Sequence, residues 1–197
     1  AAVCGNSVIW KPSPHSNECA KGIKDAWDNV SGEYADLVLV LEGGNEEAVA
    51  LCEDKRINLV SATGSTQMGK ELAPIVSARL GKLLLELGGN NAAIVCPSAN
   101  LDLAIKGIAF SACGTTGQRC TSLRRLFVQE DIYSDCVKRL ENCFNDLVIG
   151  CPTKESSQIG PLISEQSFNS MQDTINSLKQ KGVNVMGGER IEIEDPN

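Results

Sequence analysis

Histidine, aromatic residues and long apolar runs are scarce in this sequence of 197 residues. It has one histidine, His15, and aromatic residues make up 4% of the chain. A Cys/His zinc site therefore has little to be built from, and no apolar run approaches the roughly 18 residues of a membrane span. Basic residues are also outnumbered: 18 Lys and Arg face 25 Asp and Glu, for a net charge of -7. This balance argues against nucleic acid or an anionic membrane as a partner, because clustered Lys and Arg bind both.

The cysteines do not have the spacing of a disulfide scaffold or a metal site. There are nine of them, an odd number, and none form a C-x-x-C pair. Cys136 and Cys143 are seven residues apart, on one face of an expected helix, where a small apolar residue would serve. The sequence begins at Ala1 without the charged and apolar regions of a secretory signal. We expect reduced thiols, no metal site, and an intracellular protein of the cytoplasm or the mitochondrial matrix.

Short apolar runs that end at Gly or Pro alternate with segments of helical spacing. Such alternation is typical of a parallel sheet covered by helices, so we expect an α/β fold. The regular alternation of strand and helix patterns changes after Gly88-Gly89. This change predicts a domain boundary, with one domain at 1–88 and another at 89–197. The expected strands are 6–10, 36–41, 57–62, 82–87, 91–96, 125–129 and 183–186. The expected helices are 16–30, 46–54, one running from after 66 to about 80, 101–113, 132–147 and 168–178.

The segment from Gly64 to Lys70 matches most of the P-loop pattern G-x-x-x-x-G-K-[ST]. Glu71 stands at the last position, where a hydroxyl should bind Mg²⁺, so a nucleotide-hydrolysing site is the weaker interpretation. A helix N-terminus with Gly64 and Ser65 can still bind a phosphate through free amides and the helix dipole. The plainer alternative is that Ser65 or Thr63 only caps the helix.

Two reactive side chains follow glycine-rich or apolar segments. Cys120 comes after a Gly- and Thr-rich turn and directly after Arg119, whose guanidinium would favour a thiolate. Glu86 ends an apolar strand, immediately before Gly88-Gly89. Each has an ordinary alternative, because lone thiols are commonly structural and a carboxylate at a loop edge is commonly solvated. If Glu86 is a base, we expect it to be partly desolvated, with a raised pKa.

Four segments occur in the order and at the spacing of the aldehyde dehydrogenase superfamily. They are Trp10-Lys11-Pro12-Ser13, Thr63-Gly64-Ser65-Thr66, Glu86-Leu87-Gly88-Gly89-Asn90 and Gly117-Gln118-Arg119-Cys120. The chain resembles this superfamily over essentially its whole length. Within it, residues 86–91, 117–121 and 124–128 are most similar to the α-aminoadipic semialdehyde dehydrogenases, the antiquitin group. The resemblance implies a Rossmann-like cofactor domain, of which 1–88 is the C-terminal part, joined to the start of an α/β catalytic domain at 89–197.

The resemblance also assigns roles to individual residues. Cys120 would be the nucleophile that forms a thiohemiacetal and then a thioester, and Glu86 the base that activates water. Arg119, next to the nucleophile, would hold a substrate carboxylate, with Thr121 beside it. The cofactor NAD or NADP would be bound by Lys11 at the adenosine ribose, Gly64 and Ser65 at the pyrophosphate, Ala48 and Val49 at the adenine, and Leu87.

The sequence departs from the family at Pro14, where family members usually have an acidic residue that contacts the ribose. Its absence leaves NAD and NADP both open. The family's oxyanion-hole asparagine, its nicotinamide-ribose glutamate and its oligomerisation strand match no part of these residues. We therefore expect an internal fragment, inactive alone, of a dimeric or tetrameric enzyme that oxidises a small aldehyde, and within that class a semialdehyde such as α-aminoadipic semialdehyde. The alternatives are a catalytically inactive homologue with a structural role and the P-loop nucleotide binder.

Overall fold

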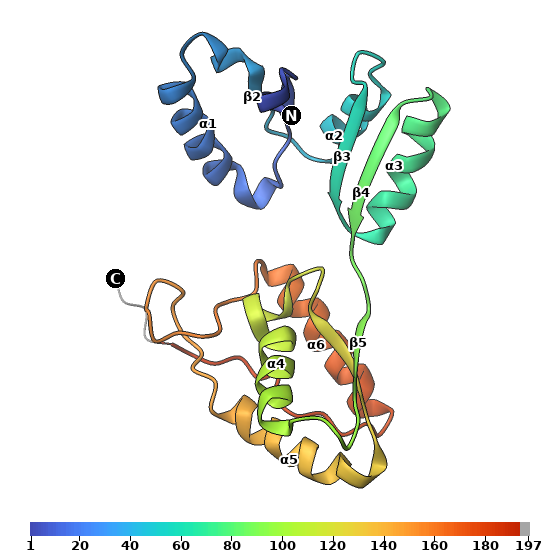
Figure 1. Cartoon of the computed structure of the whole chain (residues 1–197), viewed down its shortest axis with the longest axis vertical. Helices are drawn as coiled ribbons and strands as arrows, with labels where there is room; N and C mark the ends of the chain where they lie inside the picture. Colours follow the sequence, from blue (N-terminus) through green and yellow to red (C-terminus); the bar gives the residue numbers. More distant parts are fainter. Residues whose placement is uncertain (194–197) are drawn as a thin grey trace. The chain divides into compact units, whose positions relative to one another are not determined.

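The computed structural model describes residues 1–193 and divides the chain into two compact units (Figure 1). The first unit is Ala1–Leu87 and the second is Gly88–Asn197. Among the described residues, the strands form three pairs, β1-β2, β3-β4 and β5-β6, and each pair is parallel. Parallel neighbours need a long crossover connection, and here a helix lies in each one. The chain therefore has the expected α/β fold, built from three strand–helix–strand motifs.

The first motif pairs β1 (Val8–Trp10) with β2 (Val38–Val40) through helix α1 (Asn17–Ser31). The indole Nε1 of Trp27 donates a hydrogen bond to the carbonyl of Ala35 (3.1 Å), which ties α1 to the turn that follows it. Short 3₁₀ helices occur at Ala2–Cys4, Pro14–Ser16 and Gly32–Leu37. The last of these occupies the beginning of the expected strand 36–41, so β2 is shorter than predicted.

The second motif pairs β3 (Leu59–Gly64) with β4 (Lys82–Leu87) through α3 (Thr66–Ala78), after helix α2 (Asn45–Glu53). Its core is formed by three buried side chains from α2 and α3: Cys52, Leu72 and Val76. Gly69 lets α3 approach β4 closely, because a Cβ there would lie 2.6 Å from the Leu87 side chain. This contact places the N-terminus of α3 beside the carboxyl ends of both strands.

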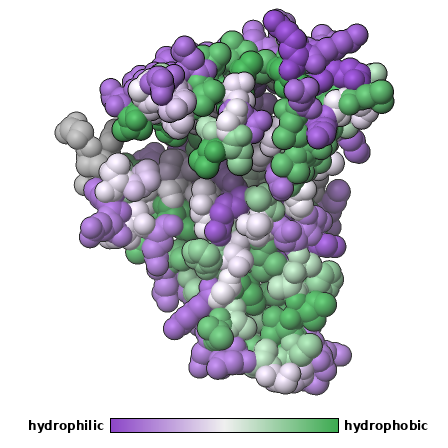
Figure 2. Space-filling model, turned by 45° about the horizontal axis from the view of Figure 1, so that its top comes forward, coloured by the Kyte–Doolittle hydropathy of each residue, from purple (hydrophilic) through white to green (hydrophobic). Residues whose placement is uncertain are grey.

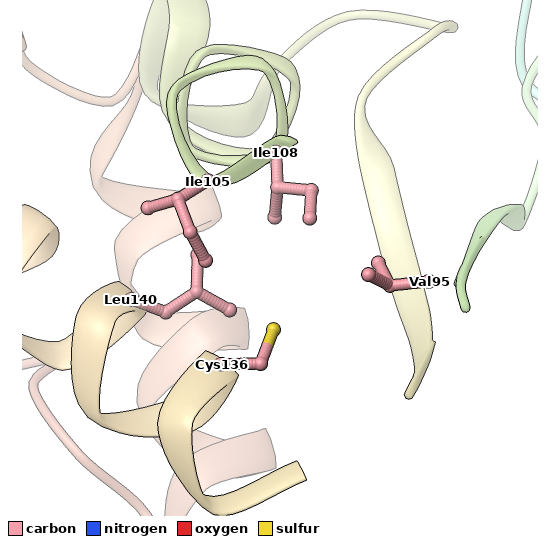
Figure 3. Packing of buried hydrophobic residues seen from close by; sticks show 5 residues of the cluster. All are labelled: Val95, Ile105, Ile108, Cys136 and Leu140. Atoms are coloured by element: carbon pink, nitrogen blue, oxygen red, sulfur yellow. The ribbon is translucent and has the colours of Figure 1, made fainter. Parts of the chain in front are cut away.

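The second unit pairs β5 (Asn91–Val95) with β6 (Leu123–Val128) through α4 (Leu101–Cys113) and a 3₁₀ turn at Gly114–Gly117. Helix α5 (Glu130–Asn145) packs on α4 and β6. Their buried side chains point toward one another in Figure 3, from β5, α4 and α5: Val95, Ile105, Ile108, Cys136 and Leu140. The predicted stripe on α5 is thus buried at its centre, whereas Phe144 near the helix end is 38% exposed.

Helix α6 (Glu165–Gln180) is the last helix of the described part. The predicted strand Val183–Met186 is wrong, since residues 183–190 have no regular secondary structure. Within residues 1–193 no strand pairs with this segment, which lies along α6 instead. The amide Nε2 of Gln172 donates to the Gly188 carbonyl (2.5 Å), and the Ile175 side chain contacts Gly188 so closely that a Cβ there would collide with it.

Replacing Cys136 with serine is expected to destabilise the second unit. Cys136 is fully buried in an apolar cluster, and a hydroxyl there would lose its hydrogen bonds to water without gaining a partner. The expected loss is about 1–3 kcal/mol of unfolding free energy, measured by chemical denaturation. The matched control is Cys96→Ser at an exposed thiol, which should stay within about 0.5 kcal/mol of the original protein. Equal stability of the two variants would contradict this account of the core.

Candidate active site

Cys120 lies in an exposed turn between α4 and β6. Three of the other thiols are less suited to nucleophilic attack because they are more buried than Cys120. Burial raises the pKa of Cys52, Cys113 and Cys136, which favours the protonated thiol over the thiolate. The exposed position of Cys120 on a polar turn thus favours the interpretation of Cys120 as a nucleophile over its interpretation as a structural thiol.

The turn that contains Cys120 is closed on itself by two hydrogen bonds. The backbone N–H of Ser122 donates to the Arg119 carbonyl (3.1 Å), and the N–H of Arg119 donates to the Ser122 hydroxyl (3.1 Å). Ser122 is 1% exposed, so its side chain is fixed inside the unit while Cys120 faces solvent. From β5, the Asn91 amide donates to the carbonyls of both Cys120 (2.8 Å) and Ser122 (2.9 Å).

The residues just before Arg119 and Cys120 have an unusual backbone. Thr115, Thr116 and Gly117 have φ values of 55°, 56° and 69°. This left-handed region is a genuine outlier for a β-branched residue and is found mostly where surrounding contacts enforce it. Here the Thr116 hydroxyl donates to the Gly160 carbonyl (2.9 Å), and the side-chain Oε1 of Gln118 accepts from the Ile163 N–H (2.9 Å). The loop at 160–163 therefore fixes residues 116–118, which precede Cys120 in the chain.

Arg119 does not face an open site in the structure. Its Nη2 donates to the carbonyl of Phe110 (2.9 Å) near the end of α4, and the guanidinium lies 4.9 Å from the Phe110 ring centroid. Gly114 leaves room for it, because a Cβ there would lie 2.1 Å from Nη2. Arg119 thus closes the C-terminal end of α4, as a cation at that end of a helix dipole should. Binding a substrate carboxylate would require its side chain to turn away from Phe110.

Thr121 is exposed and lines a shallow groove of about 510 Å³ between β5 and α4. Asn91 and Ser111 also line this groove. A second concavity, of about 590 Å³, lies between the C-terminal ends of α2 and α3, around Lys55 and Arg79. It contains none of the predicted site residues. Of these two concavities, only the groove beside Thr121 is lined by a predicted site residue, and Thr121 is next to Cys120 in the sequence.

Glu86 is the fifth residue of β4 and pairs in register with Thr63 on β3. Its side chain is exposed, so the first unit does not provide the desolvation expected for a base. Glu86 belongs to the first unit and Cys120 to the second, and neither unit by itself brings these two side chains together. The pairing of base and nucleophile stays a prediction.

Lys11 lies at the carboxyl ends of β1 and β2. Its ammonium donates to the carbonyls of Pro12 (2.8 Å) and Gly43 (3.2 Å), which uses two of its three donors. The Glu47 carboxylate accepts from the Gly44 N–H (2.7 Å). Its pKa is lowered by backbone N–H groups of Glu47 and Gly44 and, to a lesser extent, by Lys11. A ribose hydroxyl is a suitable acceptor for the remaining ammonium proton.

The N-terminus of α3 has the features of an anion site. Ser65 caps the helix, since its hydroxyl accepts from the Met68 N–H (3.0 Å), as the plainer sequence interpretation predicted. The first turn consists of the uncharged residues 66–69, so no carboxylate opposes an anion there. Gly64 is the last residue of β3, and a Cβ on it would meet the Met68 sulfur at 2.6 Å. These residues fit a pyrophosphate group.

The P-loop alternative is wrong. A P-loop needs a long turn whose amides surround a phosphate, but only Ser65 separates the end of β3 from the start of α3. Gly69 and Lys70, which the pattern places in the loop, are both inside the helix, and Gly69 packs against Leu87. The glycine therefore serves helix–strand packing and not phosphate binding.

The three other predicted cofactor residues are partly buried. Ala48 and Val49 are in the first half of α2, where Val49 packs against the core around Cys52 and Val76. Leu87 ends β4 and packs against Gly69. These contacts give Val49 and Leu87 a structural role, and contact of all three residues with a cofactor stays a prediction. In residues 1–193, no group of three or more His, Cys, Asp or Glu side chains is arranged to bind a metal ion.

Asn91, Thr116, Gln118 and Ser122 are functional candidates that sequence analysis did not assign. Asn91 belongs to the segment 86–91 that supported the family resemblance, and Gln118 and Ser122 are each two residues from Cys120. Their position in these segments was a signal, but spacing alone does not show which side chain fixes which carbonyl. The hydrogen bonds of the turn provide that information.

Comparison with known proteins extends the likeness to the whole chain. The profile of the Aldehyde dehydrogenase family matches residues 1–197. "Aldehyde dehydrogenase family 7 member A1" of Malus domestica is 37% identical over 100% of this chain and 39% of its own length. "Alpha-aminoadipic semialdehyde dehydrogenase" of Rattus norvegicus is 37% identical over 97% of this chain and 36% of its own length. These relatives confirm the predicted resemblance to the antiquitin group.

Solved structures agree with the fold. The NAD-dependent aldehyde dehydrogenase from Sinorhizobium meliloti is 30% identical with a TM-score of 0.87, over 94% of this chain and 37% of that one. Lactaldehyde dehydrogenase from Escherichia coli is 28% identical with a TM-score of 0.89, over 95% and 40%. The chain thus spans less than half the length of the relatives it matches. Since the family profile matches from its first to its last residue, the chain belongs to the aldehyde dehydrogenase family.

Proposed function

We propose that this chain is part of an enzyme that oxidises an aldehyde to a carboxylate with a nicotinamide cofactor, through a covalent intermediate on Cys120. The observation that supports it best is the exposed thiol of Cys120 on a turn whose backbone is fixed by Asn91 and Ser122. The proposal concerns a full-length protein, because the chain spans 36–39% of the curated relatives described above.

In the first step, the Cys120 thiolate attacks the aldehyde carbon. The new bond joins Sγ to that carbon, and the carbonyl π electrons move to oxygen to give a thiohemiacetal. When the oxygen re-forms its double bond, the carbon loses a hydride and a thioester remains on Sγ. The bound nicotinamide supplies the acceptor for that hydride. The turn at 119–122 contributes a fixed direction for the sulfur.

In the second step, Glu86 is the base. Its carboxylate takes a proton from water while the water oxygen attacks the thioester carbon. Collapse of the tetrahedral species breaks the S–C bond, releases the carboxylic acid and returns Cys120 as a thiolate. A carboxylate must be partly desolvated to act as an effective base near neutrality, so we expect parts of the full-length protein to cover the exposed side chain of Glu86.

NAD is the proposed cofactor. Lys11 would bind the adenosine ribose, and the N-terminus of α3, with Gly64 and Ser65, would bind the pyrophosphate; the free ammonium proton of Lys11 and the uncharged first turn of α3 support these roles. Ala48, Val49 and Leu87 complete the proposed surface. Pro14 starts a 3₁₀ turn just after Lys11 and has no carboxylate to repel a 2′-phosphate, so NADP is the second candidate.

The proposed substrate is a small aldehyde, and within that class a semialdehyde. The relatives named α-aminoadipic semialdehyde dehydrogenase support this class. Arg119 would bind its carboxylate after leaving the Phe110 carbonyl, and Thr121 lines the adjacent groove. Incubating the full-length protein with NAD and an aldehyde tests the activity. We expect NADH and carboxylate in equal amounts, and no turnover with either NAD or NADP would refute the proposal.

Replacing Arg119 with alanine should discriminate between substrates. A charged hydrogen bond to a carboxylate contributes about 1.5–3 kcal/mol, so kcat/KM for α-aminoadipic semialdehyde should fall roughly tenfold to hundredfold. A neutral aliphatic aldehyde should change by less than about threefold. The measurement is steady-state NADH formation with each aldehyde.

Arg139→Ala is the matched control, because Arg139 is in the same unit and binds Asp102 and Asp135 on the surface. It should leave both substrates unaffected. An equal loss for both aldehydes in the Arg119 variant would show that Arg119 only supports α4 through Phe110, and the substrate role would be rejected.

We also propose a homodimer or homotetramer, in the cytoplasm or the mitochondrial matrix. Large apolar side chains are exposed in the second unit, including Ile94 (77%), Leu103 (72%) and Phe110 (69%), and apolar surface is visible in Figure 2. Such exposed apolar surface commonly marks a site of contact with another protein chain.

Within residues 1–193, no helix is both long enough and apolar enough to cross a membrane.

A further inference from the structure

The side chain of Asn91 connects two backbone carbonyls of the turn that contains the nucleophile. We propose that Asn91 is a positioning residue, which fixes the Cys120 backbone so that Sγ meets the aldehyde carbon in a single geometry. This inference rests on the proposed function of Cys120. It assigns a role to a side chain that does not itself react.

The geometry uses the full donor capacity of the amide. Nδ2 of Asn91 lies 2.8 Å from the Cys120 carbonyl oxygen and 2.9 Å from the Ser122 carbonyl oxygen. A side-chain amide nitrogen has two N–H donors, so each carbonyl takes one. Ser122 is buried and bonded to Arg119 from both its N–H and its hydroxyl. Asn91 therefore links the exposed half of the turn to its fixed half.

A break in strand pairing explains why a side chain is needed here. Asn91 pairs with Leu123, whereas the next residue, Ala92, pairs with Arg125. Arg124 is thus an extra residue, and such a bulge locally disrupts the hydrogen-bond ladder between strands. The turn precedes the bulge directly, beyond the regular ladder. The Asn91 amide supplies donors at the place where the backbone of β5 does not.

Two neighbours fix Asn91 in turn. The Arg125 guanidinium donates from Nε (3.1 Å) and Nη2 (2.8 Å) to the Asn90 carbonyl, which holds the backbone just before Asn91. Gly89 leaves space beside the amide, because a Cβ there would lie 3.1 Å from Oδ1 of Asn91. The amide is thus held in a confined position from which its donors reach the turn.

Loss of this link should affect the reaction more than substrate binding. A misplacement of about 1 Å can slow a reaction by about a hundredfold. In the full-length protein, Asn91→Ala should lower kcat about tenfold to hundredfold while KM changes by less than about threefold. Gly89→Ala is a milder variant that keeps the amide but pushes on it, and it should lower kcat by about threefold to tenfold.

Hydrogen exchange provides a second measurement that does not depend on turnover. The Ser122 N–H is protected by the Arg119 carbonyl. In Asn91→Ala, exchange in the peptide that contains Ser122 should accelerate by about tenfold or more as the turn opens. The matched control is Asn100→Ala, which removes one asparagine bond in the same unit, from the Leu103 N–H to Oδ1 (3.2 Å). It should change neither exchange at Ser122 nor kcat.

Each outcome decides the inference. Faster exchange with a lower kcat and a nearly constant KM, in Asn91→Ala but not in Asn100→Ala, would support it. Unchanged exchange at Ser122, or faster exchange with an unchanged kcat, would overturn it. If the unaltered full-length protein oxidises no aldehyde, the proposed function fails and the catalytic part of this inference fails with it. The exchange measurement would still decide whether Asn91 holds the turn.

Discussion

Replacing Cys120 with serine is expected to lower aldehyde oxidation by the full-length protein at least about a thousandfold. The sulfur is the atom that bonds to the substrate carbon, and a hydroxyl at the same place is a far weaker nucleophile because it is almost never ionised near neutrality. The substitution changes one exposed atom, so the fold and cofactor binding should remain. The measurements are NADH formation for activity and fluorescence titration for binding of NADH.

Cys96→Ser is the control for this experiment, since Cys96 is another exposed thiol of the second unit. It should retain activity within about twofold, as a surface substitution away from the site should. A Cys120→Ser protein that is as active as Cys96→Ser would eliminate the covalent mechanism. Loss of NADH binding together with activity would show a folding defect, and the comparison would then require Cys120→Ala with the same two measurements.

Elements with a clear period were predictable from the sequence. The apolar spacing of Cys136 and Leu140 predicted a buried helix face, and both side chains are in the core. The strand 82–87 was predicted with its observed bounds because Gly81 and Gly88 delimit an apolar run. Val183–Met186 has the same apolar character, but a strand exists only when another strand pairs with it. Pairing is a property of the tertiary structure, so local sequence could not exclude this strand.

In the candidate site, too, some features could be predicted from local sequence, whereas others depend on tertiary structure. The sequence indicated Cys120, because a thiol between polar residues after a glycine-rich turn is unlike core cysteines, and the structure places it in an exposed turn. The sequence could not show that Arg119 closes the end of α4 at Phe110 or that Asn91 bonds the Cys120 carbonyl. Asn91 and Cys120 are 29 positions apart in the sequence. They come into contact beside the bulge in β6, where the pairing of β5 with β6 changes register. Such contacts depend on strand register, which motif spacing does not encode.

Replacing Glu86 with glutamine should divide the reaction into a retained first step and a blocked second step. An amide cannot take a proton from water, so thioester hydrolysis should slow about a hundredfold to ten-thousandfold, the usual range for loss of a general base. Cys120 remains intact, so one equivalent of NADH should form rapidly before turnover stops. Stopped-flow absorbance measures this burst, and mass spectrometry of the peptide that contains Cys120 detects the acyl group.

Glu71→Gln is the matched control, because Glu71 is also an exposed carboxylate of the first unit and its contact with Gln67 can be kept by an amide. Its turnover should be nearly normal. If Glu86 also helps deprotonate Cys120, the burst of the Glu86 variant keeps its amplitude but becomes slower. Normal steady-state turnover in Glu86→Gln would remove Glu86 from the mechanism. A missing burst with no acyl group on Cys120 would place its role before hydrolysis, since a thioester that never forms cannot accumulate.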